Sequence, residues 1–354
     1  MTLCIKVKKE KAEPLRKKLL AQGLLDISRE VIPEKTFIYF PLKGIKKETA
    51  EKLGTVLNKK FKPKTARPHS ITEILSKKLS KTELKQLRTS FDLYGEIAVV
   101  EIPAELKQKE REIASAFLVL YPKLRAVFKK TSAVAGDYRV RSLQQIAGTG
   151  TSETTYKEHG CTYKFDLSKV FFTPRLSTER LIISNQVKPN ETIVDAFCGA
   201  GPFSILIAKK SQPKHIYAID INPDAISSLK TNLALNKVSE KITPLCGDFA
   251  KLQPKIPEKA DRVIMNLPKT DKNFLPQAVK ALKQKGIINF YTFTDSEESV
   301  RQRISDFLPN TQFELLEIRN VKTYSPTESC FAADILIKKG KANKPKPFTL
   351  TRVL

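Results

Sequence analysis

The hydrophobic pattern of the first sixty residues predicts a small α/β unit. Apolar and polar residues alternate over residues 2–7, which is the period of a half-buried strand. Within residues 11–22, Leu15, Leu19 and Leu20 recur at helical spacing, and Gly23 follows where a helix would end. Short apolar runs at residues 31–33 and 36–41 predict two more strands. Residues 61–74, which begin with a basic stretch that contains two prolines, are typical of a linker.

The pattern changes twice after this linker, and each change predicts a further domain. An apolar strand at residues 97–103, a helix over about 104–120 and β-rich stretches within 138–167 predict an α+β domain over residues 75–169. From residue 170 strand-like runs alternate with helices, which is typical of a parallel sheet. The expected strand cores are 192–195, 215–220, 242–245, 262–266 and 287–291, with an antiparallel pair at 313–321 and 330–337 completing seven strands. We expect this domain to cover residues 170–339 and the basic residues 340–354 to form a flexible tail.

The charge of the chain changes the picture more than its size does. There are 63 Lys and Arg residues against 37 Asp and Glu residues, giving a formal charge of +26. Such an excess attracts a polyanion, so nucleic acid is the expected partner. No apolar run is long enough to cross a bilayer, which predicts a cytoplasmic protein without membrane contact. The five cysteines and three histidines lack metal-ligand spacing, so no metal is expected.

The clearest chemical signal is the turn after the first strand of the C-terminal domain. Residues 194–203 read Val-Asp-Ala-Phe-Cys-Gly-Ala-Gly-Pro-Phe, in which Asp195 ends the strand. Gly199 and Gly201 would let the backbone approach a ligand closely. Nineteen residues after Gly201, Asp220 ends the second strand, where a carboxylate can bind both hydroxyls of a ribose. Asp248 follows the third strand, from which it can reach an adenine amino group.

A dinucleotide site uses the same strand, turn and helix and is the main alternative. It requires a third small residue, a glycine or alanine, where this chain has Ser204. An acidic residue before the turn also suits the ammonium group of a methionine better than a pyrophosphate. The spacing therefore predicts S-adenosylmethionine as cofactor, with Phe197 and Asn222 also at its site. Taken singly, Asp220 and Asp248 could be helix caps, and Cys198 is expected to be a packing residue.

The end of the fourth strand indicates the methyl acceptor. Asn266 can hydrogen-bond the edge of a substrate there, and Pro268 stiffens the turn that follows. Enzymes that methylate exocyclic amines often carry Asn-Pro-Pro-Tyr at this place, whereas this chain has Asn-Leu-Pro-Lys. The motif favours a ring nitrogen or another atom as acceptor.

Several motifs on different predicted domains occur in an order that resembles a known family. They are Ser-Phe-Asp-Leu-Tyr-Gly-Glu-Ile-Ala at 90–98, Tyr-Arg-Val-Arg at 138–141, Glu-His-Gly-Cys at 158–161, Phe-Phe-Thr-Pro-Arg-Leu-Ser-Thr-Glu-Arg at 171–180, the glycine-rich turn and Met-Asn-Leu-Pro at 265–268. Over about residues 75–337 they resemble the archaeal and eukaryotic type of tRNA (guanine-37-N1)-methyltransferase. The resemblance implies a Rossmann-type methyltransferase domain that acts on the guanosine 3′ of the anticodon. It also implies an N-terminal module (residues 1–60) on the outer corner of tRNA, and a middle domain that helps to hold the anticodon loop.

The resemblance further implies a role for individual residues. Guanine N1 carries a proton that must leave before its lone pair can react, so a base is needed, with a donor at O6 for the developing charge. These roles fall to Glu179 and Arg139, with Asn266 on the guanine or in the pocket wall. Substrate-binding roles are implied for Arg139, Arg141, Arg175 and Pro268, although the arginines could instead bind phosphate or form ion pairs.

Three other functions remain open from the sequence. One is an aminocarboxypropyl transferase of the same fold in wyosine synthesis, which the Asn-Leu-Pro motif and Glu179 argue against. Another is a bifunctional enzyme that also methylates a wyosine intermediate, converting 4-demethylwyosine to isowyosine. The third is a non-catalytic RNA-binding protein with a vestigial fold. One chain carries a complete set of site residues, so a monomer is expected.

Overall fold

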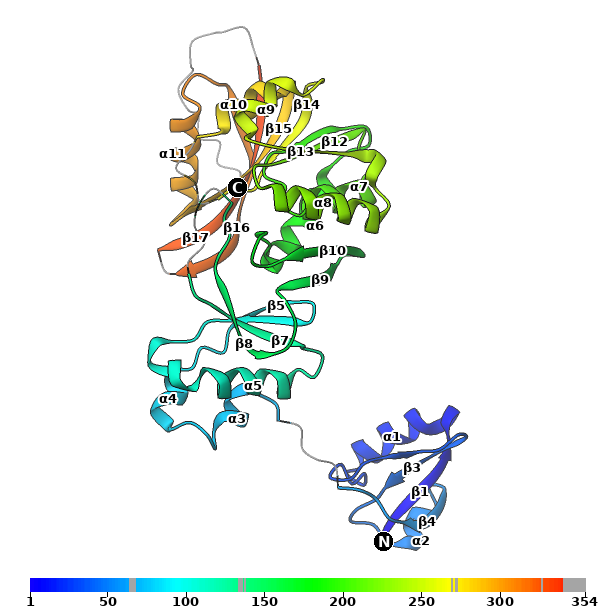
Figure 1. Ribbon diagram of the computed structural model, residues 1–354. Helices are drawn as coiled ribbons and strands as arrows, with labels where there is room; N and C mark the ends of the chain where they lie inside the picture. Colours follow the sequence, from blue (N-terminus) through cyan, green and yellow to red (C-terminus); the bar gives the residue numbers. More distant parts are fainter. Residues whose placement is uncertain are drawn as a thin grey trace. The chain divides into compact units, whose positions relative to one another are not determined.

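The computed structural model describes residues 1–63, 68–132, 136, 138–268, 270, 273–325 and 327–339 (Figure 1). The chain divides into two compact units, Met1–Glu73 and Ile74–Leu354. The predicted flexible tail, residues 340–354, lies outside the described residues. No helix among the described residues is long and apolar enough to span a bilayer.

The N-terminal unit is a four-stranded antiparallel sheet with two helices. Its strands lie in the order β2-β3-β1-β4, and its elements are β1 (Thr2–Lys8), α1 (Ala12–Ala21), β2 (Ile32–Pro33), β3 (Phe37–Pro41), α2 (Lys47–Glu51) and β4 (Thr55–Lys59). Ile5, Leu19 and Phe40 form a core between sheet and helices. The four elements expected from the hydrophobic pattern are confirmed, while α2 and β4 were not predicted because their sequences are mostly polar.

The start of the predicted linker packs with the N-terminal unit. Phe61 is buried in a cluster with Cys4 and Tyr39, and Pro63 pairs with Arg29 in an isolated bridge. These contacts place residues 61–63 in the N-terminal unit, since the aromatic ring covers the face of the sheet away from α1. The boundaries after residues 60, 74 and 169 stay predictions.

The C-terminal unit begins with a mixed sheet of order β5-β6-β7-β8 and its helices. α3 (Ile71–Leu75) spans the boundary between the two units. The elements that follow are α4 (Lys81–Gln86), β5 (Phe91–Tyr94), β6 (Ile97–Val100), α5 (Glu110–Leu120), β7 (Ala126–Lys130) and β8 (Leu143–Gly148). The helix expected from residue 104 starts as a 3-10 helix, Ala104–Lys109, and continues as α5. The expected strand at residues 138–141 is wrong, because Arg139 has a φ of 54° and the segment forms a turn.

The next two strands form a separate two-stranded sheet that packs against a helix of the Rossmann-type part. β9 (Glu153–Glu158) and β10 (Cys161–Asp166) are joined by a tight turn in which His159 and Gly160 both have positive φ. The amide nitrogens of Thr162 and Lys164 donate to the side chains of Asn236 and Asn232 on the helix α8 (Pro223–Asn236). Asparagine side chains of α8 therefore accept hydrogen bonds from backbone amides at the edge of β10.

A seven-stranded, mostly parallel sheet follows, as predicted. Its order is β13-β12-β11-β14-β15-β17-β16, with β11 (Thr192–Asp195), β12 (His215–Asp220), β13 (Ile242–Cys246), β14 (Ala260–Met265) and β15 (Leu282–Thr294) parallel and β16 (Phe313–Ser325) and β17 (Glu328–Lys338) antiparallel. The remaining helices are α6 (Ser177–Gln186), α7 (Pro202–Lys210), α9 (Phe249–Leu252), α10 (Leu275–Ala281) and α11 (Glu297–Phe307). Alternate residues of β11, Ile193 and Val194, enter different cores on the two faces. The strand order reverses between β11 and β14, which is where such sheets bind ligands.

Candidate active site

A cleft lies at the carboxyl ends of the central parallel strands. Its volume of about 1090 Å³ includes space that is open to solvent. Seven of the residues predicted for the site line it: Arg139, Phe197, Gly199, Asp220, Asn222, Asp248 and Asn266. They come together because loops that follow parallel strands leave the sheet at the same edge.

The two glycines of the turn have different roles in the structure. Gly199 lines the cleft with a φ of 54°, and a Cβ there would meet only the Phe171 carbonyl oxygen, at 3.5 Å. Gly201 has a φ of 87° and caps α7, and a Cβ there would lie 2.3 Å from Cδ1 of Leu229 on α8. Gly199 therefore leaves space for a ligand, whereas Gly201, which does not line the cleft, permits the close packing of α7 and α8.

Asp220 connects the turn to the loop after β12. Its Oδ2 accepts from the Gly199 amide at 2.7 Å, and its Oδ1 accepts from the Asn222 amide at 2.9 Å. Burial raises the pKa of Asp220, and these backbone hydrogen bonds oppose the rise. A carboxylate at the end of this strand, with about four acceptor positions, fits a pair of ribose hydroxyls.

Of the two carboxylates that could be helix caps, Asp248 is one and Asp220 is not; Asn222 is a further cap. Asn222 caps α8 through the Asp224 amide at 3.0 Å and donates to the Lys169 carbonyl at 2.7 Å. Asp248 caps α9 through the Ala250 amide at 2.7 Å, and it also lines the cleft. Asp220 is not a helix cap, and its carboxylate instead holds two ligand-facing loops together.

Asp195 lies fully buried beneath the turn, and it does not line the cleft. Its Oδ2 accepts from the Ser204 hydroxyl at 2.7 Å, while Oδ1 has no partner among the described residues. Burial raises the pKa of Asp195 to about 7, and the nearby Asp220 contributes to the rise. Asn266 Oδ1, at the cleft wall, is a second buried acceptor without a partner in the described part of the chain.

These features fit the predicted cofactor. A buried acceptor without a partner is costly, so a donor on a ligand would stabilise the site. The side chains of Phe197, Ile221, Phe249 and Phe274 add apolar walls suited to a flat base. Ile221 and Phe249 were missed from the sequence, although each directly follows a predicted carboxylate.

The opposite wall of the cleft comes from segments before β11. Tyr138, Phe171 and Thr173 line it beside Arg139, whose left-handed backbone is uncommon for a residue with a side chain and is often found at functional sites. Tyr138 and Phe171 are 48% and 39% exposed, so aromatic faces are available to a ligand. Tyr138 directly precedes Arg139, and Phe171 lies in the same motif as Arg175; these positions were the available signal.

Glu179 does not line this cleft, although the next residue, Arg180, does. Glu179 is only 4% exposed, on α6. Arg319 donates to its two oxygens, from Nε at 3.3 Å and from Nη2 at 3.2 Å, and the Tyr291 hydroxyl donates at 3.3 Å. Burial raises the pKa of Tyr291 well above its ordinary value, and Glu179 adds to this, so the phenol stays a donor.

The other predicted substrate contacts lie outside the main cleft. Arg175 donates to both oxygens of Asp92, at 2.8 and 3.0 Å, and its guanidinium lies over the Tyr324 ring. Arg141 lines a small adjacent cavity with Phe171, and Pro268 lines another beneath the Asn-Leu-Pro loop.

The cysteine in the cleft wall, Cys198, is not a reactive group. Cys198 is buried in the turn, and burial raises its pKa well above the ordinary value, as expected for a packing residue. Among the described residues, no group of His, Cys, Asp and Glu side chains could hold a metal ion.

Family models match successive parts of the chain. Residues 154–316 match the TRM5/TYW2 methyltransferase domain, residues 71–151 the TYW2 N-terminal domain, and residues 4–51 the tRNA methyltransferase 5 N-terminal domain. The tRNA (guanine(37)-N(1))-methyltransferase Trm5b of Pyrococcus abyssi is 36% identical, covering 95% of this chain and 99% of the relative. The tRNA 4-demethylwyosine(37)-methyltransferase Taw21 of Saccharolobus solfataricus is 37% identical, covering 62% of this chain and 85% of the relative.

Solved structures agree with these relatives. A complex of aTrm5 with tRNALeu has a TM-score of 0.75 at 34% identity, covering 95% of this chain and 100% of that one. Trm5 of Methanocaldococcus jannaschii in complex with adenosine has a TM-score of 0.65 at 32% identity, covering 96% and 100%. The chain therefore belongs to the TRM5/TYW2 methyltransferase family, and its similarity to Trm5 members extends over nearly its whole length.

Proposed function

We propose that this protein transfers the methyl group of S-adenosylmethionine to N1 of guanosine 37 in tRNA and so produces 1-methylguanosine beside the anticodon. The observation that carries the proposal is the similarity to Trm5b of Pyrococcus abyssi, which includes 99% of that enzyme. The cleft at the strand-order reversal supports it, because its carboxylates and apolar walls suit an adenosyl group.

We assign the cofactor contacts to residues on the β11, β12 and β13 side of the cleft. Asp220 would accept from the ribose hydroxyls, and the Phe197 and Phe249 rings would lie beside the adenine, near Asp248. Asp195, beneath the turn, would attract the ammonium of the methionine part. S-adenosylmethionine supplies the methyl group and keeps the electron pair of the carbon–sulfur bond that breaks.

We assign the guanine contacts to the other wall and to Glu179. Glu179 would take the proton from N1, which frees the nitrogen lone pair to form the new bond to carbon. Arg139 would donate to O6 and hold the negative charge that develops there, and Asn266 would bind the base edge. Glu179 would then release its proton to solvent.

The same proposal implies contacts with tRNA beyond the cleft. The anticodon loop would lie against the wall that carries Tyr138 and Phe171, with guanosine 37 unstacked to reach the cleft. The N-terminal unit would bind the outer corner of the tRNA, and one chain would act as a monomer. A cytoplasmic location stays a prediction from the sequence.

A direct test uses unmodified tRNA transcripts that differ only at position 37. The protein is incubated with labelled S-adenosylmethionine and a transcript with guanosine 37 or its adenosine 37 control. The products are then mapped by nuclease digestion and mass spectrometry. We expect 1-methylguanosine at position 37 only in the first transcript. A methyl group at another nucleotide, or on another atom of the base, would contradict the proposal.

A second candidate function is methylation of a wyosine intermediate. The 37% identity with Taw21 favours it over the shared part of the chain, although that similarity covers only 62% of this protein. A tRNA that carries 4-demethylwyosine at position 37 tests it in the same assay. Formation of isowyosine would make the enzyme bifunctional, and a gain of an aminocarboxypropyl group would instead indicate the transferase alternative.

A further inference from the structure

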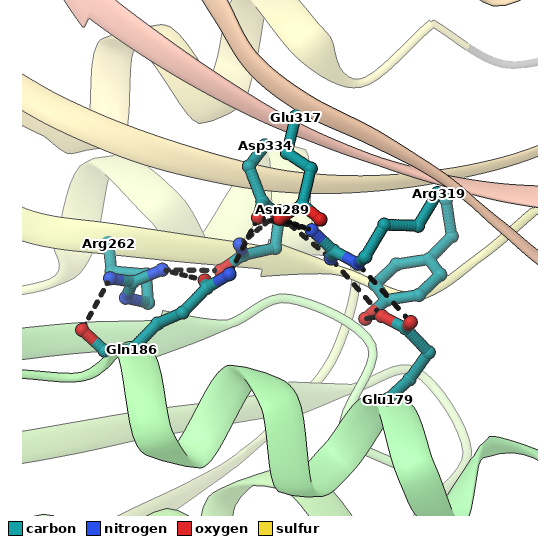
Figure 2. Close-up of polar contacts among 8 residues, drawn as sticks. Glu179, Gln186, Arg262, Asn289, Glu317, Arg319 and Asp334 are labelled. Carbon is teal, nitrogen blue, oxygen red and sulfur yellow. Dashed lines mark hydrogen bonds and ion pairs between the residues drawn. The ribbon is translucent and has the colours of Figure 1, made fainter. Parts of the chain in front are cut away.

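A buried polar network connects α6 to the antiparallel end of the large sheet. It runs from Arg262 on β14 through Gln186 and Asn289 to Asp334 on β17, and from there through Arg319 on β16 to Glu179 (Figure 2). Glu179 and Gln186 are seven residues apart on α6, so they lie on the same helix face. The network therefore holds this face of α6 at two points.

Asp334 is the fixed centre of the network. It is 3% exposed and accepts four hydrogen bonds, from Gln186 at 2.7 Å, from Asn289 at 2.7 Å, and from two nitrogens of Arg319 at 2.6 and 3.3 Å. Burial alone would raise the pKa of Asp334, but the donors outweigh it and the pKa is lowered. Asp334 is thus an ionised carboxylate whose acceptor positions are all used.

Arg319 is shared unequally between two buried carboxylates. Its contact with Asp334 is as short as 2.6 Å, whereas its contacts with Glu179 are 3.3 and 3.2 Å. Burial would lower the pKa of Arg319, but Asp334 and Glu179 raise it, so the guanidinium stays charged. Asp334 holds the guanidinium, and Glu179 meets its remaining edge.

The hydrogen bonds to Glu179 use its two carboxylate oxygens unequally. A carboxylate has about four acceptor positions. Arg319 uses one on Oε1 and one on Oε2, and the Tyr291 hydroxyl uses the second on Oε2. Among the described residues no hydrogen bond uses the second position on Oε1, which can therefore accept an incoming proton.

The charges around Arg319 are unequal. Glu179 and Asp334 carry two negative charges against the one positive charge of the guanidinium that they share. A guanidinium bound to Glu179 alone would neutralise the carboxylate and weaken it as a base.

We infer that Arg319 and Asp334 are positioning residues for Glu179: Arg319 orients the carboxylate so that Oε1 faces the guanine proton, and Asp334 prevents the guanidinium from neutralising it. This inference rests on the proposed role of Glu179 as the base. In this inference Arg319 orients Glu179, Asp334 holds the Arg319 guanidinium, and neither residue touches the substrate.

Other charged or titratable groups near Glu179 must be considered in any pH experiment. On the strands packed against α6 they are Arg319 and Glu317 on β16, Tyr291 on β15, and Asp334 and Cys330 on β17. Burial raises the pKa of Cys330 to about 12, with Glu179 adding to the rise, so this thiol stays neutral over the range used below.

The test compares pH profiles of the single-turnover methylation rate for Arg319→Gln and Asp334→Asn between pH 5 and 8.5. Loss of the guanidinium leaves Glu179 beside the negative charge of Asp334. The acid limb of the profile should therefore move to higher pH by at least about 1 unit. Loss of the Asp334 charge leaves Glu179 as the one buried carboxylate on Arg319 among the described residues, beside the half-exposed Glu317. The limb should then stay in place or move down, while the plateau rate falls roughly 10-fold.

These opposite responses separate the inference from a structural role. The inference is supported if the acid limb moves to higher pH in Arg319→Gln and does not do so in Asp334→Asn. The affinities for cofactor and tRNA should stay close to those of the parent protein. A uniform loss of rate without movement of either limb, or a rise in both variants, overturns it. If Arg319→Gln does not fold, Arg319→Lys takes its place. It keeps the charge but loses the two-point contact, so we expect an unmoved limb and a lower plateau, and a moved limb would overturn the inference.

Two further variants complete the design. Glu317 contacts the same guanidinium at 2.8 Å, but its side chain is 53% exposed, so Glu317→Gln is the matched control and should leave the limb unchanged. Glu179→Gln tests the role of the base, and mass spectrometry tests the product. A 1-methylguanosine product at parent rate in Glu179→Gln would remove the basis of the inference while leaving the proposed reaction intact.

Discussion

Arg175 and Asp92 form a two-point ion pair between segments that are 83 residues apart, with nitrogen–oxygen distances of 2.8 and 3.0 Å. Asp92 lies on β5, and Arg175 lies in the 3-10 helix just before α6. The Asp92 side chain is 9% exposed, so the pair is shielded from solvent on that side. It connects the small mixed sheet directly to the start of the helix that carries Glu179.

We expect this pair to contribute to stability more than to tRNA binding. Asp92→Asn and Arg175→Met should each lower the free energy of unfolding of the C-terminal unit, with a coupling of about 1.5–3 kcal/mol, the range for hydrogen bonds to charged groups. A double-mutant cycle in urea measures it. A coupling near zero, together with a large loss of tRNA affinity in Arg175→Met alone, would make Arg175 a tRNA contact.

Arg180 and Glu158 form a more deeply buried pair, with side chains 1% and 4% exposed. Removing one partner leaves an unpaired charge in the interior, so Glu158→Ala should destabilise the C-terminal unit by roughly 3–5 kcal/mol. Thermal and urea unfolding measure this loss. Glu314→Ala is the matched control, since its pair with Lys338 is about half exposed and should contribute at most about 1 kcal/mol. Equal losses in the two variants would contradict the prediction.

The parallel core was predictable because its signals are local. Strands β11, β12, β13 and β14 are short, mostly apolar runs, and the turn that follows β11 carries its two glycines close to Asp195. The interactions of Glu179 were not predictable. Arg319 is 140 residues further along the chain, and β16 contains three register irregularities that change which side chains face the core. Local alternation does not determine such a contact.

Two segments, one in the predicted middle domain and one in the predicted linker, differ from their local sequence pattern for related reasons. Residues 138–141 alternate like a strand, but the positive φ of Arg139 makes a turn, and turn conformations of residues other than glycine leave little trace in sequence. Phe61 was assigned to a linker because prolines and lysines surround it, although its ring is buried. In both places tertiary contacts outweigh local composition.

Asp195 should make stability depend on pH in an unusual direction. Its pKa in the folded protein is raised to about 7, whereas an unfolded chain has about 3.9. Between these values the folded state binds the extra proton, so this group's contribution decreases as pH rises towards 7 and is lost above it. Asp195→Asn should therefore raise the melting temperature, measured without cofactor, more at pH 8 than at pH 5.

The same substitution should weaken cofactor binding, because an amide cannot attract an ammonium group as a carboxylate does. Ser204→Ala, which removes the hydrogen bond to Asp195 but leaves its charge, is the control for stability. It should not raise the melting temperature at pH 8. If Asp195→Asn has the same effect on melting at both pH values, the carboxyl is not titrating in this range.

The excess of basic residues should appear in the salt dependence of tRNA binding. With a formal charge of +26, the protein should neutralise several phosphates, so the logarithm of the affinity should fall linearly with the logarithm of salt concentration. Filter binding between about 50 and 200 mM salt should show a loss of at least about 10³-fold if six or more phosphates are contacted. A flat dependence would remove the electrostatic basis for tRNA affinity.

The two glycines of the cofactor turn should respond differently to alanine. At Gly201 φ is 87° and the new Cβ would lie 2.3 Å from Leu229 Cδ1, so Gly201→Ala should destabilise the C-terminal unit through its left-handed backbone and by displacing the buried Leu229 side chain. At Gly199 the space is open, so Gly199→Ala should cost only about 1–2 kcal/mol for its left-handed backbone. Its methyl group would enter the cleft and weaken cofactor binding instead. Melting curves and calorimetric titration with S-adenosylmethionine separate the two effects. A Gly201→Ala protein with unchanged melting, or a Gly199→Ala protein with unchanged cofactor affinity, would show that the turn does not divide packing and binding between these positions.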